Sequence, residues 1–202
     1  LVQKYFAEMV EAGIQYVVME VSSQAMKLDR VAGFTYDYAI FTNLEPDHIG
    51  PGEHESLEEY IACKGRLFHC CKVANADADY LEEVMAGHTC QLETFGLGEG
   101  ADLRAVNIRR IHKPGYLGVQ YDLTGLENYS VHVDIPGDFT VYNSLAAIAL
   151  CRHLNIDREA VLDALNTIQV KGRLEIYPTP GEYTLMIDYA HNAMALDALL
   201  TN

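Results

Sequence analysis

The sequence has no long apolar run and few basic residues. No hydrophobic stretch approaches the roughly 20 residues of a membrane-spanning helix, so we expect no membrane span. Lys and Arg together number 14 against 29 Asp and Glu, which gives a formal net charge of −15. Because most of such a surface repels phosphate groups, the composition argues against a nucleic-acid-binding protein. Anionic substrates would need a divalent metal or a local cluster of cations to offset that repulsion.

Paired cysteines and a leader are missing as well. The five cysteines are odd in number and form no C-x-x-C pair, which disfavours a disulfide framework or a cysteine zinc site. The first residues contain no basic region ahead of an apolar core, so they are not a signal peptide. A cytoplasmic location is therefore expected. The chain also lacks an initiator Met, and we expect it to start inside a longer protein.

What is present is an alternation of helical and strand-like segments over the first hundred residues. The apolar spacing predicts helices over 1–11, 56–71 and 77–86, and strands over 14–21, 38–42, 72–75 and 91–95. Residues 22–33 between the first two strands are predicted to form a loop with one helical turn. This alternation predicts an α/β fold with a doubly wound, mostly parallel sheet.

The pattern changes after residue 100. Three stretches of alternating residues, 103–111, 116–123 and 129–135, predict a small antiparallel meander with one wet face. Helices are expected over 141–154 and 157–168, followed by strand-like stretches at 174–177 and 183–188 and a last helix from about residue 194. Pro178, Pro180 and Gly181 mark a boundary nearby, and we divide the chain into domains at 1–172 and 173–202.

Two polar groups follow predicted parallel strands, at the edge where such sheets bind ligands. Glu20 ends the strand-like segment 14–21 within Glu-Val-Ser-Ser, where it could hold a metal or merely cap the next turn. His48 follows Phe-Thr-Asn-Leu-Glu-Pro-Asp and suits a metal or proton-transfer role, although a lone His after a strand is more often structural.

Further candidates are weak when taken singly. Lys64 shares a helix face with Tyr60 and Phe68. Its non-functional interpretation is a side chain that extends to solvent along apolar surface. Asn143 could cap a helix, Arg173 could be a surface charge, and Asp188 could be a turn acid at a strand end.

Taken in order and with their gaps, these motifs resemble the Mur ligases. They are Glu-Val-Ser-Ser, Phe-Thr-Asn-Leu with Asp-His, a Tyr-x-x-x-Lys helix that ends in Leu-Phe, Asn-x-x-Ala-Ala, Gly-Arg-x-Glu and Asp-Tyr-Ala-His. The resemblance runs over 14–200. Within the family it is closest to the ligases that add the third peptide residue, diaminopimelate or lysine, to UDP-N-acetylmuramoyl-L-alanyl-D-glutamate.

The resemblance implies a fold and a set of roles. The fold is the P-loop-NTPase-like central domain over 1–172, followed by the beginning of a Rossmann-like C-terminal domain. Glu20, His48 and Lys64 would be magnesium ligands, with Lys64 carrying a carbamate and Lys64 and His48 serving catalysis. Ser22 and Arg30 would contact the UDP-muramoyl substrate. The nucleotide would be held by Asn143, Arg173 and Asp188.

The implied activity is an ATP-dependent amide-forming ligase of peptidoglycan precursor synthesis, with ATP and magnesium and an acyl-phosphate intermediate. The UDP-MurNAc dipeptide and a diamino acid would be its small-molecule partners. The phosphate-binding loop G-x-x-x-x-G-K-[ST] is absent from this chain, and in the family it lies upstream. We therefore expect residues 1–202 alone to be inactive and not to hydrolyse ATP.

Two departures from the family pattern concern the predicted site. The segment from His48 to Lys64 is about two residues longer than usual and contains Gly50-Pro51-Gly52 in place of an Asp-Tyr-His stretch. Leu28 stands where a polar residue that contacts substrate is expected. The rival interpretations are a folylpolyglutamate synthase, a non-catalytic protein that keeps the ligase fold, and a metal-dependent phosphoesterase. The last would show denser Asp and His ligands.

Overall fold

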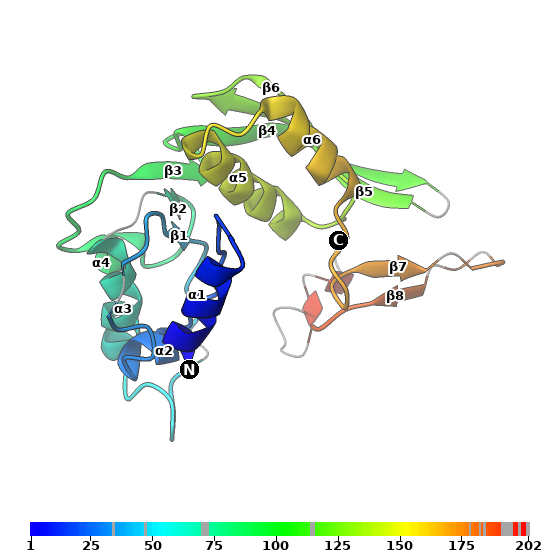
Figure 1. The fold of residues 1–202 in the computed structure, drawn as a ribbon. Helices are drawn as coiled ribbons and strands as arrows, with labels where there is room; N and C mark the ends of the chain where they lie inside the picture. Colours follow the sequence, from blue (N-terminus) through cyan, green and yellow to red (C-terminus); the bar gives the residue numbers. More distant parts are fainter. Residues whose placement is uncertain are drawn as a thin grey trace. The chain divides into compact units, whose positions relative to one another are not determined.

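The computed structural model describes residues 1–33, 35–46, 48–69, 73–113, 116–177, 179–181, 183, 185–190, 196–197 and 199–200. Contacts divide the chain into two compact units. The first unit comprises Leu1–Ala39, Asn43–Lys72 and Ala78–Gln91, and the second comprises Ile40–Thr42, Val73–Asp77 and Leu92–Asn202. Figure 1 labels the elements of each unit. None of the described helices is both long and apolar enough to cross a membrane.

A six-stranded sheet forms the centre of the second unit. Its strands follow one another in chain order: β1 (Ile40–Phe41), β2 (Val73–Asn75), β3 (Glu93–Gly96), β4 (Leu103–Lys113), β5 (Tyr116–Gly125) and β6 (Tyr129–Val133). The pairs β1–β2, β2–β3 and β3–β4 are parallel, whereas β4–β5 and β5–β6 are antiparallel. The predicted α/β class, with a mostly parallel sheet that continues into an antiparallel meander, is confirmed.

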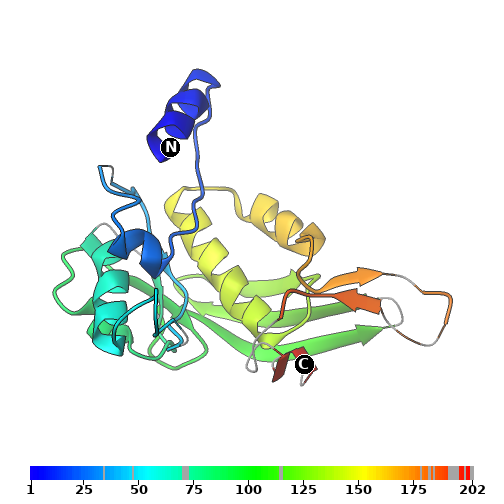
Figure 2. The same cartoon turned by 90° about the horizontal axis from the view of Figure 1, so that it is seen from below.

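Helix α5 (Asp138–His153) builds the core of this unit against the sheet. It contacts β2, β3, β4 and β5, and both views show it lying across the strands (Figure 1 and Figure 2). Val141, Leu145 and Ile148 lie on one helix face by their i, i+4, i+7 spacing and are buried. Helix α6 (Arg158–Thr167) contacts β6 and adds Leu165 to the same core. Both predicted helices are confirmed, with α5 starting three residues earlier than expected.

A separate two-stranded antiparallel sheet follows α6. It consists of β7 (Glu175–Tyr177) and β8 (Leu185–Ile187), within the two stretches predicted to be strand-like. The predicted domain boundary at residue 172 and the Rossmann-like character of 173–202 stay predictions. The start of the helix expected from residue 194 lies outside the described residues.

The first unit is helical. It contains α1 (Val2–Glu11), α2 (Ser23–Lys27), α3 (Leu57–Gly65), the 3₁₀ turn η1 (Arg66–His69) and α4 (Leu81–Met85). Met26, Val31 and Cys63 form one small buried cluster in it. Helix α3 contacts both α2 and α4. A Cβ atom at Gly65 would lie 2.9 Å from the Val84 carbonyl oxygen, so a glycine permits the close approach of α3 and α4.

Two predicted helices are shorter than expected. The helix predicted over 56–71 leaves the α conformation at Gly65, whose low helix propensity favours an end there, and continues as η1. The helix predicted over 77–86 begins only at Leu81, because Tyr80 has a left-handed backbone with φ of 60° that cannot continue a right-handed helix.

The strand predicted over 14–21 is wrong. This segment is extended but pairs with none of the described strands, and Ile14 and Val18 are exposed to 52% and 90%. A run of β-branched residues favours an extended backbone, whereas a strand also requires a neighbour for its N–H and C=O groups. The apolar run predicted the first property and not the second.

Candidate functional site

The side chain of Tyr60 on α3 is the centre of a cluster in the first unit. Ser56 caps this helix by accepting a hydrogen bond from the Glu59 backbone N–H at 3.2 Å, as its sequence predicts. Glu58 and Glu59 lie in the first turn, where they complement the helix dipole. The Tyr60 side chain is almost fully buried. Because of this burial, the ring is a fixed surface for its neighbours.

Lys64 and His48, two of the predicted site residues, both contact the Tyr60 ring. The Lys64 Nζ lies 5.4 Å from the ring centroid, within range of a cation–π interaction. The His48 ring meets the same ring edge-on, with the centroids 5.9 Å apart and an interplanar angle of 86°. Residues 16 positions apart in the chain thus converge on one aromatic side chain.

The Lys64 amine has a surrounding that is compatible with a carbamate. Its Nζ donates a hydrogen bond to the Asn43 carbonyl oxygen at 3.2 Å. A carbamate nitrogen keeps one hydrogen, so the contact to Asn43 can persist after modification, while the added oxygens supply the hard ligands that magnesium prefers. An unmodified ammonium group would repel the metal.

Glu20 and His48 are exposed, as ligands for a metal shared with a large substrate need to be. The His48 Nδ1 lies 3.6 Å from a Glu53 carboxylate oxygen, which adds an acid beside the imidazole. Within the described part of the chain, no group of three or more His, Cys, Asp and Glu side chains could hold a metal. Magnesium sites commonly take only one or two protein carboxylates and complete their shell with water and phosphate. The meeting of Glu20 with His48 and Lys64 stays a prediction.

The two residues predicted to contact the UDP-muramoyl substrate, Ser22 and Arg30, flank helix α2. The Ser22 Oγ accepts a hydrogen bond from the Ala25 backbone N–H at 3.1 Å and caps the helix. Its hydroxyl hydrogen can still donate to a ligand, since the cap uses the oxygen alone. Arg30 is exposed in the turn after α2, where its backbone N–H donates to the Ala25 carbonyl at 2.9 Å.

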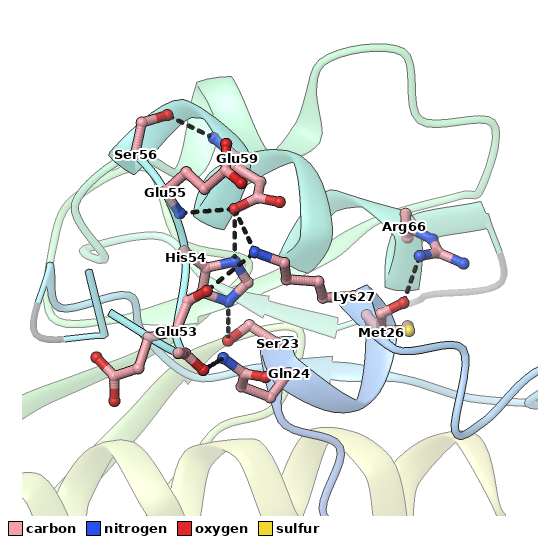
Figure 3. Close-up of polar contacts among 11 residues, drawn as sticks. Ser23, Gln24, Met26, Lys27, Glu53, His54, Glu55, Ser56, Glu59 and Arg66 are labelled. Carbon is pink, nitrogen blue, oxygen red and sulfur yellow. Dashed lines mark hydrogen bonds and ion pairs between the residues drawn. The ribbon is translucent and has the colours of Figure 1, made fainter. Parts of the chain in front are cut away.

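A buried polar network joins α2 to α3, and sequence reasoning missed it. His54 is fully buried, with its Nε2 2.8 Å from the Ser23 Oγ and its Nδ1 3.5 Å from the Glu59 carboxylate (Figure 3). The same carboxylate accepts from Lys27 Nζ at 2.8 Å. The hydrogen bond from Lys27 lowers the pKa of Glu59, so Glu59 is ionised at neutral pH. The Ser-x-x-Glu capping pattern of Ser56 and Glu59 was the one available signal.

The predicted nucleotide-binding residues lie in the second unit. Asn143 is exposed in the second turn of α5. Asp188 accepts hydrogen bonds from the backbone N–H groups of Leu174 and Ala190, at 2.9 and 2.7 Å. The Arg173 guanidinium lies over the Tyr189 ring at 4.8 Å from its centroid. Asp188 thereby joins the segments that carry Arg173 and Tyr189. Asp47 and His191, which belong to the motifs quoted above, lie outside the described residues.

The carboxylate of Asp77 joins three segments of the second unit, and the sequence analysis did not predict this role. It follows β2, and its carboxylate accepts hydrogen bonds from the backbone N–H groups of Leu97 and Gly98 and from the Tyr142 hydroxyl at 3.1 Å. Tyr142 precedes Asn143 on α5. Burial, together with the negative charge of Asp77, raises the pKa of Tyr142 to about 12. Asp77 therefore holds the loop after β3 and the start of α5 together.

The substitution Asp77→Asn is expected to lower the pKa of Tyr142 part of the way toward 10, because burial, the larger cause of its raised value, remains. In the unsubstituted protein, Tyr142 stabilises the folded state below pH 10 and loses this contribution as the pH rises toward 12. The difference in ultraviolet absorbance titration between each protein and its Tyr142→Phe derivative measures the shift. An unchanged Tyr142 step in Asp77→Asn would contradict the assignment.

Comparison with known proteins gives the family. The profile of the Mur ligase middle domain matches residues 1–151. The chain belongs to the Mur ligase family. It is 38% identical to UDP-N-acetylmuramoyl-L-alanyl-D-glutamate–2,6-diaminopimelate ligase 1 of Clostridium acetobutylicum, over 98% of this chain and 41% of that protein. This Mur ligase chain thus spans about two fifths of the length of the curated relatives it matches.

Solved structures agree on the fold. A UDP-N-acetylmuramoyl-L-alanyl-D-glutamate–2,6-diaminopimelate ligase superposes with a TM-score of 0.71 and 26% identity, over 90% of this chain and 38% of that one. The folylpolyglutamate synthetase of Lactobacillus casei superposes with a TM-score of 0.62 over 86% of this chain and 43% of that one. At 17% identity, the second likeness shows the fold alone.

Proposed function

We propose that the whole protein is an ATP-dependent ligase that adds the third amino acid, diaminopimelate or lysine, to UDP-MurNAc-L-Ala-D-Glu. The observation that carries the proposal is the convergence of His48 and Lys64 on the Tyr60 ring. A relative with this activity in its name is 38% identical over almost the whole chain. The reaction belongs to peptidoglycan precursor synthesis, and we place it in the cytoplasm.

The reaction proceeds in two steps. The γ-phosphoryl group of ATP passes to the free carboxylate of the substrate and gives an acyl phosphate. The amino group of the diamino acid then attacks the acyl carbon, and the tetrahedral intermediate expels phosphate and leaves an amide. Phosphoryl transfer asks the protein mainly to position groups and to stabilise charge, and the exposed cations and ligands of this chain suit that task.

Glu20, His48 and a carbamylated Lys64 hold magnesium in this proposal. The metal supplies neutralisation of the charge on the transferring phosphoryl group. The carbamate converts the Lys64 cation into an anion, while Tyr60 of α3 contacts both Lys64 and His48. Because a net charge of −15 repels anionic substrates, the metal also offsets that repulsion in this proposal.

Ser22 and Arg30 bind the UDP-muramoyl dipeptide, and Asn143, Arg173 and Asp188 bind the nucleotide. The free hydroxyl hydrogen of Ser22 and the exposed guanidinium of Arg30 are donors for an anionic ligand. Asp188 acts on the nucleotide through its own carboxylate or by fixing the backbone beside Arg173.

The test uses the full-length protein with ATP, magnesium and UDP-MurNAc-L-Ala-D-Glu. Phosphate release that depends on both the dipeptide and either diaminopimelate or lysine, with a product of the matching mass, supports the proposal. A parallel assay with a folate and glutamate tests the second candidate, folylpolyglutamate synthesis, since the Lactobacillus casei folylpolyglutamate synthetase shares the fold. Turnover in the folate assay alone would replace the proposed substrate, and turnover in neither assay would favour a non-catalytic protein.

A further inference from the structure

The buried network around His54 is outside the set of predicted site residues, yet it adjoins several of those in the first unit. His54 has no exposed surface and belongs to the loop that precedes α3. Its Nε2 is 2.8 Å from the Ser23 Oγ, and Ser23 is the first residue of α2. Its ring also stacks on Tyr60, with the centroids 4.9 Å apart and an interplanar angle of 25°. One side chain therefore contacts both the start of α2 and the ring that supports Lys64 and His48.

The proton on the His54 ring can be placed from its neighbours. The Glu59 carboxylate lies 3.5 Å from Nδ1, and the hydrogen bond from Lys27 keeps that carboxylate ionised. A carboxylate on this side favours the tautomer with the proton on Nδ1. The Nε2 lone pair then accepts a hydrogen bond from the Ser23 hydroxyl.

A serine, a histidine and an acid in this order resemble the parts of a nucleophilic site. The burial of the serine argues against that function. Ser23 is only 5% exposed and His54 is fully buried, so a substrate carbonyl cannot reach the Ser23 oxygen without unfolding α2. The arrangement is therefore suited to holding two segments in a fixed position.

Other contacts tie the same segments together at the surface. Lys27 Nζ donates to the Glu53 carbonyl at 2.9 Å, and Gln24 Nε2 donates to the Gly52 carbonyl at 3.4 Å (Figure 3). On the other side of α2, the Arg66 guanidinium donates to the Met26 carbonyl. These are partly exposed contacts, which are individually weak in water. The His54–Ser23 hydrogen bond is the buried member of the set, and its loss leaves a polar atom without a partner.

We propose that His54 is a positioning residue of the ligase reaction, which fixes Ser22 through Ser23 and fixes Lys64 and His48 through Tyr60. This inference rests on the proposed function. The segment between His48 and Lys64 contains Gly52 and Glu53, the two residues whose carbonyl oxygens accept hydrogen bonds from Gln24 and Lys27 of α2. Residues 52–54 thereby provide three consecutive contacts to α2, two through backbone carbonyls and one through the His54 ring.

Four variants of the full-length protein test the two parts of this proposal separately: the contact of His54 with Ser23 and its contact with Tyr60. Ser23→Ala removes the hydroxyl and leaves the His54 ring in place. His54→Phe keeps a ring against Tyr60 but removes both nitrogens. His54→Gln can still accept from the Ser23 hydroxyl but no longer stacks on Tyr60. Ser144→Ala is the matched control, since it removes a buried hydroxyl that is 2.8 Å from the Tyr121 hydroxyl in the second unit.

The measured quantities are kcat, the KM for UDP-MurNAc dipeptide, the KM for ATP, and carbamate on Lys64 by ¹³C NMR after incubation with labelled bicarbonate. Ser23→Ala and His54→Phe are expected to raise the dipeptide KM about tenfold, since small displacements of binding groups have effects of this size, and to leave the ATP KM nearly unchanged. In His54→Gln, the dipeptide KM is expected to lie close to that of the unsubstituted protein, whereas kcat and the carbamate signal are both expected to fall. Ser144→Ala is expected to lower the Tm without raising the dipeptide KM relative to the ATP KM.

Two results would overturn the inference while leaving the ligase assignment intact. One is a dipeptide KM close to that of the unsubstituted protein in both Ser23→Ala and His54→Phe. The other is an equal rise in the KM of every substrate that follows the loss of Tm, as expected of a structural contact alone. If His54→Phe does not fold, the comparison of Ser23→Ala with Ser144→Ala decides. An unsubstituted protein without ligase activity overturns the proposed function and this inference together.

Discussion

Lys64→Arg in the full-length protein is expected to lower kcat by about 10³-fold, because the metal contributes several kcal/mol to charge stabilisation and each 1.36 kcal/mol is a factor of ten. Arginine keeps the positive charge and can still lie over the Tyr60 ring, where Lys64 Nζ now lies at 5.4 Å. A guanidinium, however, remains a cation, and a cation repels the magnesium that the carbamate oxygens would bind. The substitution thus separates the carbamate from the cation–π contact.

The measurement combines steady-state kinetics with the ¹³C carbamate signal and with intact mass in bicarbonate buffer. Lys4→Arg is the matched control, since Lys4 is an exposed residue of α1 whose Nζ lies 3.5 Å from Glu8 one helical turn away. It is expected to leave kcat unchanged, as exposed pairs of this kind contribute little. Full activity of Lys64→Arg, or a bare amine on Lys64 in an active protein, would refute the carbamate role.

The sequence predicted the fold best where a local pattern alone determines the element. The antiparallel strands β4, β5 and β6 bury alternate side chains over part of their length, such as Leu103 and Ala105, Tyr121 and Leu123, and Val131 and Val133, and all three strands appear where the sequence alternation placed them. Helix α6 begins after Asp157, whose carboxylate accepts from two backbone N–H groups, as a capping acid should. Such local signals require no knowledge of distant parts of the chain.

The failures come from properties that a local pattern does not contain. The segment 14–21 has the composition of a buried strand, but residues 14–18 are exposed and the segment has no strand partner among the described residues. The end of α3 at Gly65 and the late start of α4 at Leu81 depend on backbone conformation at single positions. A strand requires a neighbour, and the apolar spacing of one segment does not say whether a neighbour is present.

The candidate site divides in the same way. The motifs predicted Lys64 and His48, and the structure brings both to Tyr60. His54 and Ser23 were missed because each is an ordinary polar residue in its own stretch of sequence. Their significance comes from a distance of 2.8 Å between residues 31 positions apart and from complete burial of the imidazole. Only the folded chain contains that information.

Arg173→Lys in the full-length protein is expected to lower kcat/KM for ATP by about 10²-fold, because hydrogen bonds to charged groups contribute about 1.5–3 kcal/mol and lysine lacks the planar fork of donors. The guanidinium of Arg173 is pre-oriented by the Tyr189 ring at 4.8 Å, and its backbone neighbour Leu174 donates to Asp188. Arg158→Lys is the matched control, since Arg158 lies over the Tyr129 ring at 5.3 Å and has no predicted role. Both substitutions keep the charge and weaken a stacked contact, so a common effect on stability cancels between them.

A fall in kcat/KM for ATP in Arg173→Lys alone, with the dipeptide KM unchanged, assigns the guanidinium to the nucleotide. An equal kcat/KM for ATP in Arg173→Lys and Arg158→Lys would show that Arg173 does not bind the nucleotide and that its contact with Tyr189 is structural.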